Sequence, residues 1–490
     1  MRYTLLIFGL FIHYISTSQD TYFKVFETQE YSSISQVESI DQRFFISGTT
    51  VCNNSECTTI SEINSSGDII WEKLIPWIDV ARSSMVLNGD SIFLSGNNIG
   101  DGGNSFFFHI MDINTGDSIA THKVFDPNNP KNNMFFLGST IYNNKLVMTG
   151  TGRGSIRNSL IYVIDKTGIL DTLIAIEKTN ANTSAYTPIV DTDNNLNIVI
   201  QKNSSEIEDT KKIITFNSNL DSIWSYETAP DNSSWFNIPV LINYDSNSFL
   251  LTNTGGFYAA IHWIEKIDKD KNVLWKFRWP IINSIGRNIK KIKILKNGDI
   301  IGVGRYQDFD LEKFDRRIDG SPFIFKLSPE GDLLWERVFI KPDPVQNDIM
   351  IKGSLNDILE LEDGSLMAVG FWGFPIANRL IVRTSSDGCI EEDCGVLNLI
   401  TKVEENQFTS FQISPTLVTN NRIFITLEIH EWNDLKYSIK DIHGSTVVSG
   451  ELNSQHHEII LPLDQNGYYF VTIQNENTIL ATKKIVFIKN

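Results

Sequence analysis

One pattern of about fifty residues recurs along most of this chain and restricts the possible folds more than any other feature. Each unit has an apolar strand that ends in Gly or a small polar residue, a second strand, a tight turn, and a third strand that often carries Trp. The seven apolar strands end at residues 48, 96, 150, 201, 253, 304 and 370. Helical repeats would instead show a 3.6-residue period. The spacing is typical of a β-propeller, in which each repeat forms one small sheet.

A turn position and a Trp position follow each apolar strand at nearly constant distance. The turn residues are Gly67, Gly116, Gly168, Leu220, Lys271, Gly331 and Gly388. Glycine supplies the positive φ that a tight hairpin turn requires. Four residues later stand Trp71, Trp224, Trp275 and Trp335, with Ala120, Thr172 and Glu392 in the other units. We expect one face of each Trp strand to pack on the adjacent sheet and the other to meet solvent.

The seventh unit lacks its last strand, because no apolar, Trp-bearing segment follows Gly388. Residues 22–26 have the same character as residues 334–339, the last strand of the sixth unit. We therefore predict that the N-terminal segment completes the last sheet and closes the ring, which removes an exposed sheet edge. The predicted fold class is all-β, a seven-bladed β-propeller followed by a small Ig-like β-sandwich. The spacing alone also leaves six or eight blades open.

The Gly-x-x-x-Trp repeat is similar to that of quinoprotein-like and delta-60-like propellers. The resemblance implies a β-propeller, and in some quinoproteins it implies a bound pyrroloquinoline quinone. Such enzymes need a Trp floor and a metal site built from clustered Glu, Asn and Asp, whereas the Trp residues here stand at repeated structural positions. We therefore predict no catalytic residue, no cofactor and no metal site in this chain.

Residues 1–18 have the pattern of a signal peptide. Arg2 precedes an apolar run over residues 3–15, and the small residues at 16–18 favour cleavage before Gln19. A run of about 13 residues is shorter than the ~20 needed to cross a bilayer, which disfavours a membrane anchor. We predict a mature protein without a transmembrane segment that passes through the periplasm and is secreted or held at the cell surface.

The four cysteines form two local pairs, Cys52 with Cys57 and Cys389 with Cys394. Outside the cytoplasm such pairs are natural disulfides, each closing a short loop. A zinc site would need the two pairs to converge, usually with a nearby His, and neither pair has one. The pairs are therefore predicted to be disulfide staples.

A second domain is predicted after the propeller. The repeat occupies residues 19–395, a mostly polar linker spans residues 396–407, and residues 408–490 contain short alternating strands typical of a β-sandwich. Three of its segments, at 437–448, 463–473 and 482–489, resemble the C-terminal sorting domain of the type IX secretion system. The motif residues that carry the resemblance are Asp441, Gly444, Gly467, Tyr469, Lys483 and Lys484.

The sorting domain differs from the family pattern in two places. One extra residue separates Leu463 from Gly467, and Ile413-Ser414-Pro415-Thr416 replaces the family's opening Tyr-Pro-Asn-Pro. The resemblance implies the type IX secretion machinery as a partner and passage across the outer membrane. It implies nothing about a ligand of the propeller.

The net charge of −17 disfavours a nucleic-acid partner, which would need a basic stripe. Acidic runs such as residues 191–195 contain oxygen donors suited to Ca²⁺, but such runs are more often plain turns. We predict a non-enzymatic surface or secreted protein that binds a glycan or a protein, with the charged insertion Tyr306–Asp319 as a candidate contact loop. The alternatives are a polysaccharide hydrolase or lyase with its site in the channel, and a structural component of the envelope.

Overall fold

The structure is a computed structural model. It describes residues 21–26, 28, 30–52, 55–75, 79–100, 103–124, 133–153, 159–165, 169–176, 182–203, 210–228, 238–254, 263–279, 285–308, 318–340, 353–373, 376–391, 394, 397–399, 404–405, 411–414, 417–418, 421–427, 435–441, 445–452, 454, 456–462, 466–475 and 478–488. Every regular element in these residues is a β-strand. The predicted signal peptide lies outside them. Residues 1–25 and 29–404 form one compact unit, and residues 26–28 with 405–490 form a second.

In its described residues the first unit contains seven sheets, numbered here in chain order. Sheet 1 contains β2 (Ser33–Ile40), β3 (Arg43–Cys52), β4 (Ser55–Ile63) and β5 (Ile69–Ile75); sheet 2 contains β6 (Asp79–Asn88), β7 (Ser91–Gly100), β8 (Gly103–Asp112) and β9 (Ser118–Val124); sheet 3 contains β10 (Asn133–Tyr142), β11 (Lys145–Arg153), β12 (Ser159–Ile164) and β13 (Leu170–Ile176). Sheet 4 contains β14 (Asn182–Ala185), β15 (Ile189–Val190), β16 (Leu196–Asn203), β17 (Thr210–Phe216) and β18 (Ser222–Glu227); sheet 5 contains β19 (Ile238–Asp245), β20 (Ser248–Thr254), β21 (Trp263–Asp268) and β22 (Val273–Arg278).

The last two sheets each recruit strands from distant parts of the chain. Sheet 6 contains β23 (Ile285–Ile294), β24 (Ile300–Asp308), β25 (Ile318–Leu327), β26 (Leu333–Ile340) and β30 (Leu397–Leu399); sheet 7 contains β27 (Gly353–Glu360), β28 (Leu366–Trp372), β29 (Asn378–Thr384), β1 (Tyr22–Phe26) and β31 (Glu404–Glu405). β1 lies beside β29, so the prediction that the N-terminal segment completes the last sheet is confirmed. β30 pairs in parallel with β26, so a strand of sheet 6 comes from the stretch predicted as a linker.

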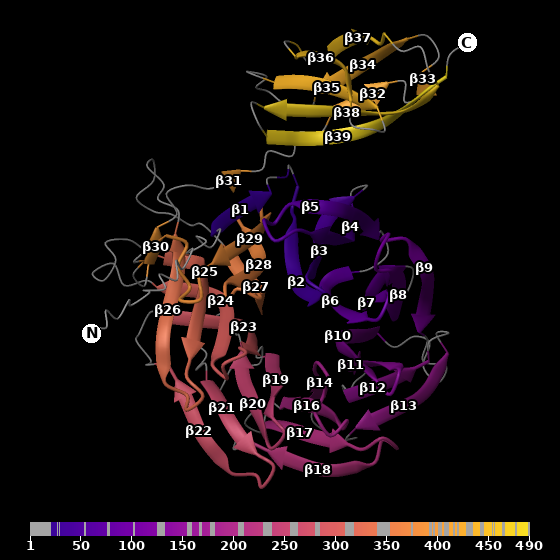
Figure 1. Cartoon of the computed structure of the whole chain (residues 1–490). Coiled ribbons are helices and arrows are strands. Elements are labelled where there is room, and N and C mark those ends of the chain that lie inside the picture. Colours follow the sequence, from indigo (N-terminus) through magenta and orange to yellow (C-terminus); the bar gives the residue numbers. More distant parts are fainter. Residues whose placement is uncertain are drawn as a thin grey trace, which may run out of the picture. The chain divides into compact units, whose positions relative to one another are not determined.

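The seven apolar strands found in the sequence are β3, β7, β11, β16, β20, β24 and β28, the second strand of each sheet. Figure 1 shows the seven sheets following one another around a common centre, with their first strands innermost. The prediction of an all-β chain is confirmed, and sheets built on four core strands fit the predicted propeller.

The core of this unit lies between neighbouring sheets. Each buried apolar cluster combines residues from two consecutive sheets, as in the group that joins Phe45 and Ile60 of sheet 1 to Met85 and Leu94 of sheet 2. The same holds at the closure, where Phe23 of β1 packs with residues of sheets 6 and 7. Each sheet therefore buries both faces, which explains why its central strands are apolar on successive residues.

The Gly that ends several apolar strands has a specific structural cause. In sheets 1, 3, 6 and 7 the Gly at the end of the apolar strand pairs with a residue of the first strand. A β-bulge in the first strand directly follows that residue in each of these four sheets. A Cβ atom on Gly304 would lie 2.0 Å from the carbonyl oxygen of Asn288, and one on Gly370 would lie 1.9 Å from that of Ser354. Such approaches exclude any side chain, so the bulge requires Gly on the facing strand.

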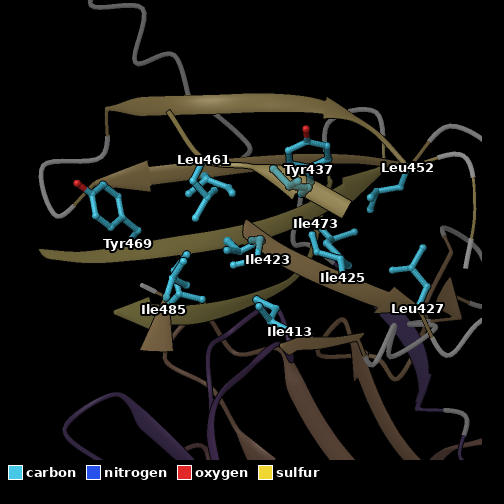
Figure 2. Packing of buried hydrophobic residues seen from close by; sticks show 14 of the residues in the cluster. Ile413, Ile423, Ile425, Leu427, Tyr437, Leu452, Leu461, Tyr469, Ile473 and Ile485 are labelled. Atoms are coloured by element: carbon cyan, nitrogen blue, oxygen red, sulfur yellow. The ribbon is translucent and has the colours of Figure 1, made fainter. Parts of the chain in front are cut away.

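The second unit contains two sheets that share one core. One has the order β32 (Phe411–Ser414), β34 (Arg422–Leu427) and β37 (His456–Ile460); the other has the order β33 (Leu417–Val418), β39 (Thr478–Phe487), β38 (Gly467–Asn475), β35 (Leu435–Asp441) and β36 (Thr446–Glu451). Figure 2 shows Ile423 and Ile425 of the first sheet meeting Ile473 and Ile485 of the second, and all four are fully buried. The sequence analysis did not identify β33, which pairs in parallel with β39.

Candidate functional site

The predicted Trp positions lie at separate junctions between sheets and do not gather into one site. A Cβ atom added to Gly116 would lie only 2.7 Å from the ring of Trp71, so Trp71 of sheet 1 packs on the turn of sheet 2. Trp275 and Gly331 repeat the contact between sheets 5 and 6, also at 2.7 Å. Trp335 packs in the same way on the turn of sheet 7.

Two of these Trp side chains also donate hydrogen bonds across the junction. Nε1 of Trp224 donates to the Lys269 carbonyl at 2.7 Å, and Nε1 of Trp275 donates to the Pro329 carbonyl at 3.0 Å. Each acceptor stands two residues before the turn residue of the next sheet. The turn residues Gly67, Gly116, Gly331 and Gly388 have φ values of 76°, 66°, 90° and 80°, while Gly168 lies outside the described residues.

Tyr22 takes the Trp position at the closure. A Cβ atom on Gly67 would lie 2.7 Å from the Tyr22 hydroxyl oxygen and 3.0 Å from the Tyr22 ring, and the hydroxyl donates to the Ser65 carbonyl at 3.3 Å. Lys24, two residues later, forms a 2.8 Å ion pair with Asp68. β1 therefore contacts sheet 1 as other last strands contact their next sheet. The sequence analysis placed Glu392 at this position of the seventh unit, and that residue lies outside the described residues.

The other predicted residues have local roles in the structure. Cys52–Cys57 and Cys389–Cys394 are disulfides with Cα separations of 5.9 and 5.6 Å. Of the insertion Tyr306–Asp319, residues 309–317 lie outside the described part of the chain, so its role as a contact loop stays a prediction.

The sorting-motif residues lie on the second unit. The Asp441 carboxylate accepts the Ser445 backbone N–H at 2.9 Å, which joins the end of β35 to the residue before β36. Gly467 begins β38, and the Tyr469 ring is buried against Phe487. Lys483 is exposed on β39, and Lys484 follows it on the same strand. Gly444 lies outside the described residues.

The candidate functional site is a cavity of about 510 Å³ at the centre of the first unit. Its wall is formed mainly by the innermost strands β2, β6, β10, β23 and β27. The extra residues of the four β-bulges all line it, namely Ser35, Leu137, Lys290 and Asn356. A volume of this size suits a small ligand.

Side chains from three of the sheets bond to the backbone of the innermost strand of the next sheet. The Gln36 amide donates to the Met85 carbonyl and accepts its N–H, both at 2.8 Å. Asn356 donates to the Ile34 carbonyl at 2.7 Å, and Asn97 accepts the Phe136 N–H at 2.9 Å. These bonds satisfy strand edges that would otherwise be open and fix the shape of the wall.

The carboxylates of the cavity are already engaged. Asp357 accepts the N–H groups of Val37 and Ile358 at 3.1 and 2.8 Å, and the Lys293 ammonium lies 3.2 Å from it. The same ammonium lies 3.9 Å from Glu38. Burial opposes the charged form of Lys293, but these two carboxylates raise its pKa overall. The arrangement is a neutralised cluster that supports the wall.

Lys290 differs from these groups. It is the bulge residue of β23, it lines the cavity, and within the described residues no hydrogen bond or ion pair holds its ammonium. Desolvation by the surrounding protein lowers its pKa, and the positive charge of Arg305 adds to that effect. Ser139 of β10 also lines the cavity, and its hydroxyl is buried without a hydrogen-bond partner among the described residues. Sequence reasoning missed Lys290, because only the bulge register reveals that this residue faces the centre.

The described residues contain no cluster of three or more His, Cys, Asp or Glu side chains arranged to hold a metal ion. Within the same residues, no helix has the length and apolar character needed to cross a membrane.

The comparison with protein families identifies the second unit. Residues 419–489 match the secretion system C-terminal sorting domain. The chain therefore carries a type IX sorting domain, which confirms the resemblance found in the sequence and implies secretion or attachment to the cell surface through that machinery. No curated protein matches the chain.

The comparison with solved structures returns distant likenesses. The β-propeller domain of the Trilobed protease from Pyrococcus furiosus is 11% identical, with a TM-score of 0.40, covering 71% of this chain and 98% of that one. Pyrococcus horikoshii acylaminoacyl peptidase is 12% identical, with a TM-score of 0.40, covering 82% of this chain and 58% of that one. A quinoprotein alcohol dehydrogenase-like protein from Bacteroides thetaiotaomicron is 11% identical, with a TM-score of 0.36, covering 63% and 66%. At these levels no activity is inferred from the likeness.

Proposed function

We propose that this protein is an exported, non-enzymatic binding protein, in which a seven-bladed β-propeller holds a ligand at its centre and an Ig-like sandwich serves as the secretion address. The seven sheets of the described residues support the blade count, with β1 completing the last. Residues 1–18 are proposed to direct the chain to the periplasm, and the sorting domain to direct it across the outer membrane.

The observation that carries the binding role is the state of the charged groups around the cavity. A glycoside hydrolase of the usual type needs two carboxylates free to act as acid and as base or nucleophile. Here Asp357 accepts two backbone N–H groups and contacts Lys293, which also lies near Glu38. Such carboxylates hold the wall together. Lys290, in contrast, is available to a ligand, and a preformed cavity with an available polar group favours binding over hydrolysis.

The experiment is a screen of the mature protein, residues 19–490, for both binding and degradation of acidic and neutral saccharides. Retention of a ligand without release of new reducing ends would support the binding role. Turnover of any polysaccharide would refute it in favour of the hydrolase or lyase. Absence of binding to every ligand would leave the envelope component as the better hypothesis.

The export role is tested separately in cells. Removal of residues 408–490 should leave the propeller in the periplasm, whereas the full chain should reach the surface or the medium. Equal export of the two forms would contradict the assigned role of the sorting domain.

A further inference from the structure

We propose that the central cavity recognises an oxyanion, a carboxylate or a sulfate, on a small or sugar-sized ligand, with Lys290 as the charged contact. This inference rests on the proposed binding function and specifies the chemistry of its ligand.

The first step is the placement of Lys290. β23 pairs regularly with β24 up to Ile289 and Gly304, then skips one residue and resumes at Lys291 and Val303. The skipped residue, Lys290, is released from the ladder, as bulge residues are. Its side chain is therefore carried by a fixed backbone and faces the cavity.

The second step is a comparison of the four bulge residues. Asn356 uses its amide to bond the neighbouring strand. Leu137 is apolar, and Ser35 is a small hydroxyl residue. Lys290 alone of the four carries a charge, and within the described residues that charge has no structural partner. A cation kept near a cavity and not used by the fold is available to a ligand of opposite charge.

The third step is the rest of the wall. Lys291 adjoins Lys290 and also lines the cavity, while the two acidic side chains, Glu38 and Asp357, are offset by Lys293. The potential at the β23 side therefore favours an anion.

The test measures binding of glucuronate, galacturonate and glucose 6-sulfate to the mature protein by calorimetry, with glucose and galactose as neutral counterparts. A charge-assisted hydrogen bond accounts for roughly a 10- to 100-fold change in affinity. We expect Lys290→Gln to lose about that factor for the anionic ligands, and Lys290→Arg to keep most of the affinity. Lys436→Gln, which removes an exposed lysine of the second unit, should bind as the wild type does.

The outcomes separate this inference from the proposed function. Equal affinity for a uronate and its neutral hexose, or an unchanged affinity in Lys290→Gln, would overturn the oxyanion site while leaving a binding protein. Binding of uronates without the sulfate, or the reverse, would identify which oxyanion the site takes. Failure of every ligand to bind wild type would overturn both proposals. Lys290→Arg retains the charge, so it should keep the affinity that Lys290→Gln loses. Melting curves of both variants show whether any loss of affinity comes from misfolding.

A second readout does not depend on knowing the affinity. A lysine with a lowered pKa and no partner reacts with acylating reagents faster than a paired lysine does. We expect mass spectrometry to show early labelling of Lys290, slow labelling of Lys293, and protection of Lys290 by a bound uronate. Labelling of Lys290 that is unaffected by a uronate that binds would contradict the assignment.

The affinity should also fall at high pH. Since the pKa of Lys290 is lowered by its surroundings, the ammonium loses its proton at a lower pH than an ordinary lysine, and anion binding is lost as pH rises through that point. The other charged groups near it are Lys291, Lys293, Arg305, Glu38 and Asp357. Lys293 titrates later because its pKa is raised.

Discussion

A Gly304→Ala substitution tests the explanation of the repeat most directly. The added methyl group would lie 2.0 Å from the Asn288 carbonyl oxygen and 2.8 Å from the Phe323 ring. The nearest atom belongs to the backbone of a bulge, so the clash cannot be relieved by rotating a side chain. Overpacking in a core costs 1–3 kcal/mol and occasionally more, and a backbone clash belongs at the upper end, at about 3 kcal/mol. For a large domain this is a fall in melting temperature of roughly 6 °C.

The matched control is Asn253→Ala in sheet 5. Asn253 occupies the same position of the repeat, but it pairs with Pro239 in a part of β19 that has no bulge. Asparagine already has a Cβ atom, so the substitution adds no atom at that position. Thermal unfolding followed by circular dichroism should separate the two variants by several degrees. If Gly304→Ala and Asn253→Ala unfold at the same temperature, the bulge is not the reason for Gly in the repeat.

Three further predictions concern the junctions of the propeller, each measured as a change in the free energy of unfolding. Lys271→Gly should raise the free energy of unfolding by about 1 kcal/mol, because Lys271 is exposed and has a φ of 71°. Leu220→Gly, at a φ of 66°, should raise it less, because Leu220 packs against a buried cluster. Equal increases in the two variants would contradict this explanation. Tyr22→Phe should lower the free energy of unfolding by about 1 kcal/mol, because it removes the hydrogen bond to the Ser65 carbonyl. Tyr22→Trp should be tolerated. A severe loss of stability in Tyr22→Trp would show that Tyr22 does not occupy a Trp position. Glu336→Gln should cost about 3 kcal/mol, because it leaves the partly buried Arg287 guanidinium without the buried carboxylate that pairs with it. A change below about 1 kcal/mol would refute this pairing.

The repeat could be predicted from the sequence because its signal is local and recurs. An apolar strand, a turn and a Trp in constant order predict one sheet, and seven similar spacings predict a series of them. The closure could be predicted for a related reason, since residues 22–26 supplied the one strand that the seventh unit lacked. The same logic led to the sorting domain, whose motifs lie close together at the end of the chain.

Other features could not be predicted, because they depend on register. Ile70, Leu274 and Leu334 directly precede Trp residues, and an apolar pattern alone would place them in the core. They are 59%, 52% and 50% exposed, because each Trp turns inward toward the next sheet and its neighbour therefore turns outward. The β-bulges are equally hidden, since one extra residue in a strand leaves no mark in composition.

The bulge also explains how a propeller can acquire a ligand site without changing its repeat. Gly304 and its equivalents are fixed by backbone contacts, and the Trp positions are fixed by the turns they pack on. The bulge residue satisfies neither requirement, and it differs among Ser35, Leu137, Lys290 and Asn356 while the strand pairing stays the same. All four line one cavity, so a change at a bulge residue that bonds no neighbouring strand, such as Lys290, alters the chemistry of the centre and leaves the blades intact.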